Sequence, residues 1–190
     1  YNRAGIANQL SLTHLRYDTS DLLMIRQLLL QKVNFTKTSL INSHEPYPSK
    51  RELFKRAENG YEEAQKEYPF LRFERRSIKS SLYGKLGNYI GFTGYYNPFT
   101  GEAQVNTAVP KFLQPYIATH EIAHQIGYAK ENEDNFVGYL AAINSTDTLF
   151  HYSTYLELFL YANREVYYFD SASSRKSFEL LVPGVKKDIA

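Results

Sequence analysis

Two histidines and a glutamate lie close together in the run His120-Glu121-Ile122-Ala123-His124, which has the pattern HExxH. Residues four apart on a helix share one face, so both imidazoles can bind one metal ion. Glu121 is rotated by about 100° from His120, which places it beside the ion as a general base. Because zinc lowers the pKa of a water molecule to about 7, the run predicts a zinc-dependent hydrolase site.

The pattern is specific for a chain of this composition. With 5 His in 190 residues, HExxH should arise by chance in well under about one chain in a hundred. Ile122, Ala123 and Ile126 are apolar and can bury the back of the helix. A surface helix with two unrelated histidines, which is the alternative, would seldom have such a flank.

A catalytic zinc site needs a third protein ligand and leaves a fourth position for water. Six residues after His124, where metzincins carry their third histidine, the chain has Lys130, which argues against that class despite Gly127. Glu131 and Glu133 are the alternatives, and we favour Glu131. Both glutamates could instead belong to an exposed acidic helix N-terminus, which the helix dipole favours.

Other side chains would complete such a site. Asn135 lies four residues after Glu131, on the same helix face, and is predicted to support a ligand from the second shell. The chain has 17 Tyr, and many should line a cleft or rim because a buried hydroxyl needs a partner. Candidate oxyanion donors are Tyr152, His151 and Tyr155, although packing roles are more common for such residues.

Zincin clefts usually have an edge strand above the metal that pairs with an extended substrate. The best candidate is the segment shortly before the motif, which would bind a peptide by strand addition. An ordinary hairpin strand is the alternative, and the two are not exclusive. The residues of this segment are Glu102, Ala103, Gln104, Val105 and Asn106.

The elements that carry these residues can be predicted from the sequence. Pro115 fits the first turn of the motif helix, and Gly127 fits a left-handed position after its end. Thr19, Ser20 and Asp21 give a capping signal for an amphipathic helix that extends to about residue 34. Further helices are predicted at about residues 50–66, 132–144 and 148–164, and after residue 174.

The segment from residue 83 to 107 is rich in glycine and in aromatic and β-branched residues. Asn97 and Pro98 supply a turn, so strands are predicted at about residues 89–96 and 102–106. We therefore expect an α+β, zincin-like fold, mostly helical, with a small antiparallel sheet beside the HExxH helix. Residues 1–190 are expected to form a single domain.

Composition limits the function classes. The formal net charge is +2, and Lys and Arg are interleaved with Glu from Lys50 to Lys79, so no nucleic-acid-binding surface is expected. The chain has no Cys, so a metal must be held by His and carboxylates. No apolar run reaches the roughly 20 residues that span a bilayer; the run from Leu22 to Leu30 is broken by Arg26 and Gln27.

A family resemblance rests on the segments NPFTGEAQVN and HEIAHQIGYAKENEDNF, between Asn97 and Leu140. The chain resembles a family of bacterial membrane-anchored domains of unknown function, similar to gluzincin zinc peptidases in ending the metal site on a glutamate. The likeness extends to residues 1–3 and 182–188, and so covers most of the chain. The chain departs at Asp134, where related Glu-zincins often carry Ala, which bears on the register of the third ligand.

The resemblance implies N-terminal transmembrane helices outside this chain and an extracytoplasmic position at a bacterial inner membrane. We expect the chain, which opens at Tyr1, to be a fragment of such a protein. The predicted function is a Zn²⁺-dependent peptidase with ligands His120, His124 and Glu131, acting on a peptide or protein such as a cell-wall peptide. Alternatives are an inactive peptide-binding or scaffolding module with a structural zinc, and an enzyme inhibited by a segment outside the chain. Oligomeric state stays open.

Overall fold

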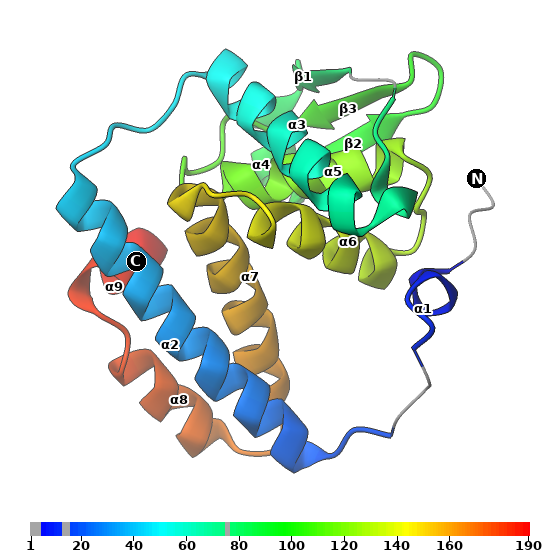
Figure 1. Cartoon of the computed structure of the whole chain (residues 1–190). Coiled ribbons are helices and arrows are strands. Elements are labelled where there is room, and N and C mark those ends of the chain that lie inside the picture. Colours follow the sequence, from blue (N-terminus) through cyan, green and yellow to red (C-terminus); the bar gives the residue numbers. More distant parts are fainter. Residues whose placement is uncertain (1–4, 13–15, 75–76) are drawn as a thin grey trace.

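The computed structural model describes residues 5–12, 16–74 and 77–190. It is mostly helical, with one small sheet beside α3, α5 and α6 and a second group of helices around α2 and α7 (Figure 1). The helices are α1 (Ile6–Gln9), α2 (Thr19–Ser43), α3 (Lys50–Glu67), the 3₁₀ helix η1 (Pro69–Leu71), α4 (Gly84–Ile90), α5 (Gln114–Gln125), α6 (Glu131–Ile143), α7 (Thr148–Tyr167), α8 (Ser171–Glu179) and α9 (Pro183–Ile189). The strands are β1 (Ile78–Ser80), β2 (Gly94–Asn97) and β3 (Glu102–Val105).

The motif helix α5 is the centre of the larger hydrophobic core. It packs on α3, α6, α7 and β3, and its residues Ile117 and Ile122 belong to that core. Tyr61 of α3 is fully buried, and its hydroxyl donates a 2.6 Å hydrogen bond to the carbonyl oxygen of Thr119. Pro115 lies in the first turn of α5, as predicted. The helix is therefore held from several sides, which fixes the direction in which His120 and His124 point.

The sheet is mixed, with the strand order β1–β3–β2. β1 is parallel to β3, with Ile78 opposite Ala103, and β2 is antiparallel to β3, with Gly94 opposite Val105. The prediction of a purely antiparallel sheet is therefore wrong. It missed β1, which is only three residues long and too short to show a period of two.

The strand predicted at 89–96 also begins too early, because residues 84–90 form the helix α4 and β2 starts at Gly94. Gly84 and Gly87 face the sheet, and a Cβ on Gly84 would lie 2.6 Å from Oδ1 of Asn106. The glycines thus let a helical backbone lie directly on the end of β3. Gly91 then ends α4 in the left-handed region, with φ 79°, before β2 begins.

Helix α2 extends to Ser43, nine residues beyond the predicted end near 34. The hydroxyls of Thr36 and Thr38 donate hydrogen bonds to carbonyls one turn earlier, so these polar residues remain within the helix. Its N-cap is Asp18, which accepts hydrogen bonds from two backbone amides, rather than the predicted Thr19 or Ser20. Within the described part of the chain, none of the helices is both long and apolar enough to cross a bilayer.

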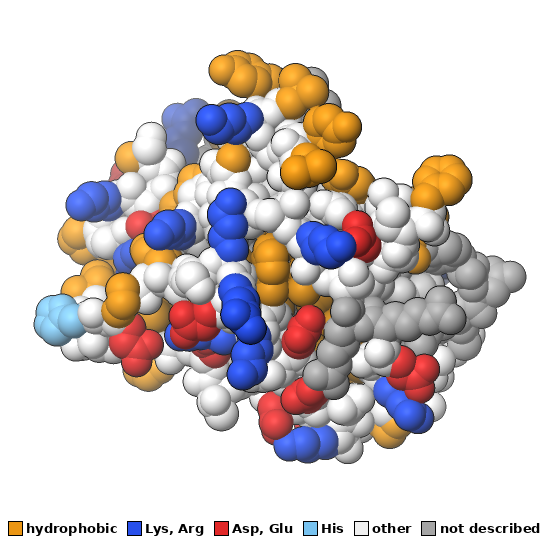
Figure 2. Space-filling view, turned by 90° about the horizontal axis from the view of Figure 1, so that it is seen from above, with side chains coloured by type: hydrophobic (Ala, Val, Ile, Leu, Met, Phe, Trp, Pro, Cys, Tyr) orange, Lys and Arg blue, Asp and Glu red, His pale blue; other side chains and the backbone are white. Residues whose placement is uncertain are grey.

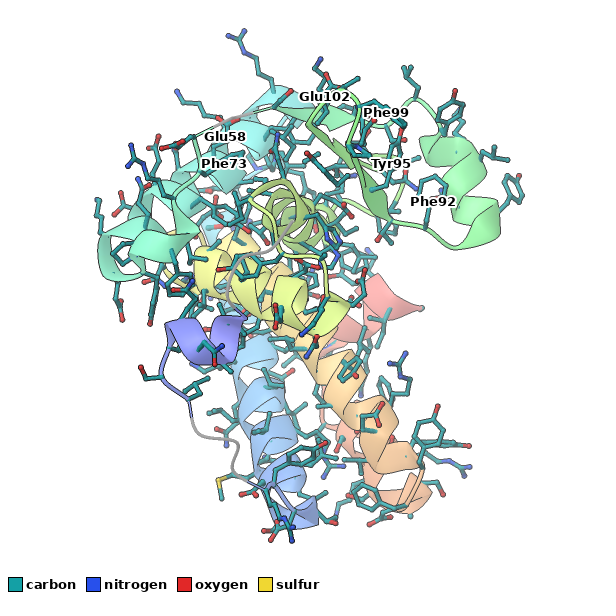
Figure 3. The ribbon with its side chains drawn as sticks, turned by 90° about the vertical axis from the view of Figure 1, so that its right-hand side faces the viewer. Glu58, Phe73, Phe92, Tyr95, Phe99 and Glu102 are labelled. Carbon is teal, nitrogen blue, oxygen red and sulfur yellow. The ribbon has the colours of Figure 1, made fainter. Side chains whose placement is uncertain are left out.

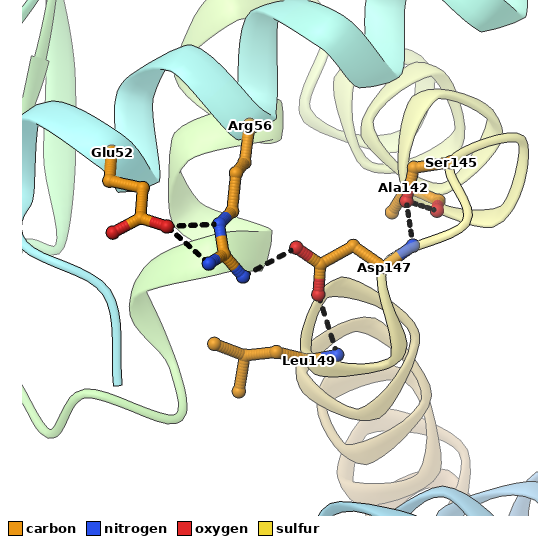
Figure 4. A network of polar contacts seen from close by, with 6 residues as sticks. All are labelled: Glu52, Arg56, Ala142, Ser145, Asp147 and Leu149. Atoms are coloured by element: carbon orange, nitrogen blue, oxygen red, sulfur yellow. Dashed lines mark hydrogen bonds and ion pairs between the residues drawn. The ribbon is translucent and has the colours of Figure 1, made fainter. Parts of the chain in front are cut away.

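A polar network joins α3 to the start of α7 (Figure 4). Asp147 caps α7 by accepting a 2.9 Å hydrogen bond from the backbone amide of Leu149. Its other oxygen accepts a 3.1 Å hydrogen bond from Arg56 of α3, which also binds Glu52. The Asp147 carboxylate therefore caps α7 and also links α7 to α3.

Asp147→Ala is expected to lower the free energy of unfolding by about 1–2 kcal/mol, because it removes the cap of α7 as well as the ion pair. Glu52→Ala removes only the more exposed partner of Arg56 and should cost less than about 0.5 kcal/mol. Urea unfolding of both variants measures the difference. Equal costs would contradict a capping role for Asp147.

Candidate metal centre

The two histidines of the motif lie on one face of α5, as the spacing predicts. The ring centroids of His120 and His124 are 4.8 Å apart, with the rings nearly perpendicular. Gly127 follows with φ 108°, a left-handed conformation that turns the chain toward α6. Glu131 is the first residue of α6, so this short turn brings it back to the histidines.

The carboxylate of Glu131 lies between the two imidazoles. Its Oε2 is 3.6 Å from Nε2 of His120, and its Oε1 is 3.6 Å from Nε2 of His124. One donor atom from each of the three residues lies within 4.8 Å of the others. In a tetrahedral zinc site with bonds of about 2.1 Å, ligand atoms are about 3.4 Å apart. The three side chains therefore fit a metal ion with little movement.

The alternative ligand, Glu133, points elsewhere. Its carboxylate is 3.6 Å from Nζ of Lys130, and a Cβ on Gly5 would lie 2.9 Å from its Oε1. Glu131, in contrast, has 76% of its side chain exposed. Among the described residues, the group that could hold a metal contains Glu131 and not Glu133.

A buried carboxylate that the sequence analysis did not assign fixes the orientation of His124. Its Nδ1 lies 2.9 Å from Oδ2 of Asp134, which is fully buried, and 3.2 Å from the carbonyl oxygen of Tyr128. Two acceptors facing Nδ1 place the proton there, which leaves the lone pair of Nε2 for a metal. The sequence did contain a signal for this contact: Asp134 lies three residues after Glu131 and therefore shares its helix face.

His120 is supported from α5 and α6. Asn135, the residue predicted to support a ligand, interacts with this side chain from α6. The hydroxyl of Tyr116 donates a 2.9 Å hydrogen bond to Oδ1 of Asn135. Tyr116 was missed, although it lies four residues before His120 and so shares its helix face. Gly138 of α6 also lies against this point, and a Cβ there would be 3.2 Å from the backbone nitrogen of His120.

The charges of the site follow from burial and from these contacts. Burial, together with the neighbouring His124, lowers the pKa of His120 to about 4, so its imidazole is neutral at pH 7. Burial also opposes the charged form of His124, but Asp134 outweighs it and raises the pKa of His124 to about 9. Burial raises the pKa of Glu121 to about 8. A cation beside Glu121 would favour its ionised form.

Glu121 is almost fully buried, at 2% exposed, under strand β2. A Cβ on Gly94 would lie 2.3 Å from its Oε1, so only glycine leaves room for the carboxylate. Residues 91–96 line a cavity of about 400 Å³ together with the three candidate metal ligands and Glu121. Gly94, the first residue of β2, is the sequence signal for this close approach, because a glycine in a strand often marks a point where another group comes near the backbone.

The prediction that Glu102–Asn106 forms the edge strand of a cleft is wrong. β3 is the central strand and pairs with β1 on one side and β2 on the other. The strand that borders the cavity is β2. Figure 3 shows Phe92 and Tyr95 on this side of the molecule, and their rings form a T-shaped contact with centroids 5.9 Å apart.

The structure does not bring the candidate oxyanion donors to the histidines. Tyr152 is buried, and its hydroxyl donates a hydrogen bond to Asp188. Nε2 of His151 contacts the carbonyl oxygen of Ser145 at 2.8 Å. Tyr155 packs against the second hydrophobic core, between α2 and α7. All three lie on α7, and none of them lines the cavity that contains the two histidines.

Comparison with known proteins gives a family. The model of the family described as "Protein of unknown function (DUF3810)" matches residues 1–190. The chain belongs to the DUF3810 family. No curated protein and no solved structure matches this DUF3810 chain. The resemblance to a domain-of-unknown-function family is thus confirmed, and any activity must be argued from the site itself.

Measurements of zinc affinity would show which of Glu131 and Glu133 is the third metal ligand. Glu131→Ala should lower zinc affinity by more than about 100-fold, because loss of outer-sphere partners alone usually costs 10- to 100-fold. Glu133→Ala is the matched control and should bind zinc within about twofold of the unmodified chain. Competition titration against a chromogenic chelator measures both. Loss of zinc in Glu133→Ala with full zinc in Glu131→Ala would reverse the assignment.

Proposed function

We propose that this chain is a zinc-dependent peptidase with Glu121 as its general base. The observation that carries the proposal is one arrangement: three convergent ligand atoms lie beside a buried carboxylate, in a cavity bordered by an edge strand. Two imidazoles and one carboxylate suit zinc better than magnesium or calcium, which prefer oxygen ligands alone. A zinc ion bound there would acidify a water molecule and polarise a scissile carbonyl.

Glu121 is suited to move the proton that such a hydrolysis releases. Its Oε2 is buried and has no hydrogen-bond partner in the described part of the chain. An ionised carboxylate there can accept a proton from a water molecule and later donate it to the leaving amine. Strand β2 and α5 hold this side chain in place, so the transfer needs no large movement.

Strand β2 is the proposed platform for an extended substrate. Thr93 accepts a 2.9 Å backbone hydrogen bond from Asn106, and antiparallel strands alternate inward and outward backbone groups. The N–H and C=O of Gly94 therefore point away from β3, at an edge that lines the cavity. A peptide strand pairing here would pass over the metal-binding side chains.

The number of ligands favours an enzyme over a scaffolding module with a structural zinc. The described residues place three His or carboxylate donors in this group, and Asp134 is turned to Nδ1 of His124 instead of joining it. Structural zinc sites usually have four protein ligands, whereas catalytic sites have three. We place the activity on the extracytoplasmic side, with peptides such as cell-wall peptides as substrates, on the family resemblance alone.

The test is zinc reconstitution of the purified chain followed by incubation with a peptide library. We expect one zinc per chain, cleavage of a subset of peptides, loss of cleavage after chelation, and recovery when zinc is restored. Absence of bound zinc after reconstitution would overturn the metal site. One bound zinc without cleavage of any peptide would favour the scaffolding module.

A further inference from the structure

Helix α4 has the reverse of an ordinary surface pattern: its small residues are buried and its large apolar residues face solvent. Gly84 lies on Asn106, and a Cβ on Gly87 would lie 3.0 Å from the ring of Phe92. The side chains that point outward from α4 and from the turn before it are Leu82 (93% exposed), Tyr83 (60%), Leu86 (57%) and Tyr89 (89%). We name these four residues the α4 patch.

The α4 patch stands out from the body of the molecule. In Figure 3 α4 projects beyond β2 at one side of the ribbon, and in Figure 2 hydrophobic side chains gather along the upper edge, over this helix. Exposed apolar side chains that occur singly are ordinary, but a contiguous group usually marks an interaction site. The α4 patch is therefore a candidate binding surface.

We propose that the α4 patch inserts into the headgroup region of an anionic lipid bilayer. Tyrosine prefers the membrane–water interface, where its ring is apolar and its hydroxyl stays hydrated. Lys85 lies within the patch and is exposed. Residues 77–101 contain no acidic residue, and their two lysines are Lys79, which pairs with Glu102, and the exposed Lys85. The charge of Lys85 complements a negatively charged lipid surface.

Shape and size argue against two other occupants. The patch is convex, whereas a peptide segment is bound in a concave groove. Four side chains supply only a fraction of the roughly 800 Å² per partner that a stable protein interface buries. Shallow insertion of a few apolar side chains into a bilayer has no such size requirement. The proposal does not depend on the metal site or on peptidase activity.

The absence of Trp from the chain permits a clean fluorescence test. Tyr89→Trp places a single indole in the α4 patch, and Phe35→Trp places one at a 73% exposed position on α2 as the matched control. With vesicles of phosphatidylcholine containing 30% phosphatidylglycerol, only the Tyr89→Trp emission should shift to the blue. An unshifted spectrum, or equal shifts in both proteins, would overturn the proposal.

Vesicle co-sedimentation then measures the contribution of each part. The triple variant Leu82→Ser, Leu86→Ser, Tyr89→Ser should bind the anionic vesicles at least about tenfold more weakly, and Lys85→Glu several-fold more weakly. Met24→Ser, at a 70% exposed position on α2, is the control and should bind normally. Unchanged binding of the triple variant contradicts insertion. A dimer of the unmodified chain that the triple variant abolishes in light scattering would assign the patch to a second copy instead.

Discussion

Glu121→Gln is expected to reduce kcat/KM for peptide hydrolysis by about 10²- to 10⁴-fold while zinc stays bound. Glutamine has nearly the same shape as glutamate and cannot accept the proton of a water molecule. Glu121 contributes no atom to the metal-binding group, so zinc content should not change. The side chain is 2% exposed, and a neutral amide at this position avoids the cost of burying a charge.

The comparison requires equal zinc content in both proteins, measured on the same samples as the rates. Glu133→Gln makes the same chemical change two residues beyond Glu131 and should leave the rate within about twofold of that of the unmodified chain. Equal activity of Glu121→Gln at equal zinc content would remove Glu121 from the reaction. Loss of zinc in this variant would show that its carboxylate helps to hold the metal.

Gly94→Ala is expected to reduce kcat/KM by about 10- to 100-fold, again with zinc retained. The added methyl group would lie 2.3–2.6 Å from three atoms of the Glu121 side chain, so either β2 or the carboxylate must move. A displacement of about 1 Å can cost about 100-fold in rate. His120, His124 and Glu131 lie outside these close contacts, so metal affinity should stay within a few-fold.

Phe99→Ala is the control for Gly94→Ala, because Phe99 is 97% exposed and lies beyond the end of β2, outside the residues that line the cavity. It should retain full activity and zinc. Steady-state kinetics on a peptide selected from the library, together with circular dichroism to confirm folding, would measure both variants. Full activity of Gly94→Ala would show that the position of the Glu121 carboxylate has no role in the rate.

The sequence predicted the local part of the site and not the part that depends on tertiary contacts. His120 and His124 share a helix face by spacing alone, and a short turn returns the chain to α5, so that Glu131 lies beside both imidazoles and Asn135 near His120. Asp134 was not assigned to His124, because the rotation of α6 about its axis decides whether residue 134 or 135 faces a given histidine. That rotation is set by packing, including the contact of Gly138 with α5.

The sheet was the weakest part of the prediction for a related reason. The glycines at 84 and 87 are poor helix formers, and the aromatic residues around them favour strands, so local preference pointed away from α4. The helix forms because those glycines fit against Asn106 and Phe92, a contact that sequence spacing does not reveal. The missed strand β1 caused a further error, because without it β3 would be an edge strand, whereas the edge strand that borders the cavity is β2.

Gly138 fixes α6 against α5 at His120, whereas Glu131 lies at the open side of the site with most of its side chain in water. A bound ion would therefore be held by two ligands on a rigid helix and by a third ligand whose side chain is mostly exposed to solvent. Its release would begin when Glu131 swings into solvent, while the imidazole pair keeps its geometry. The residence time of the metal would then depend mainly on one surface side chain, and recapture would be fast because two of the three bonds need no rearrangement.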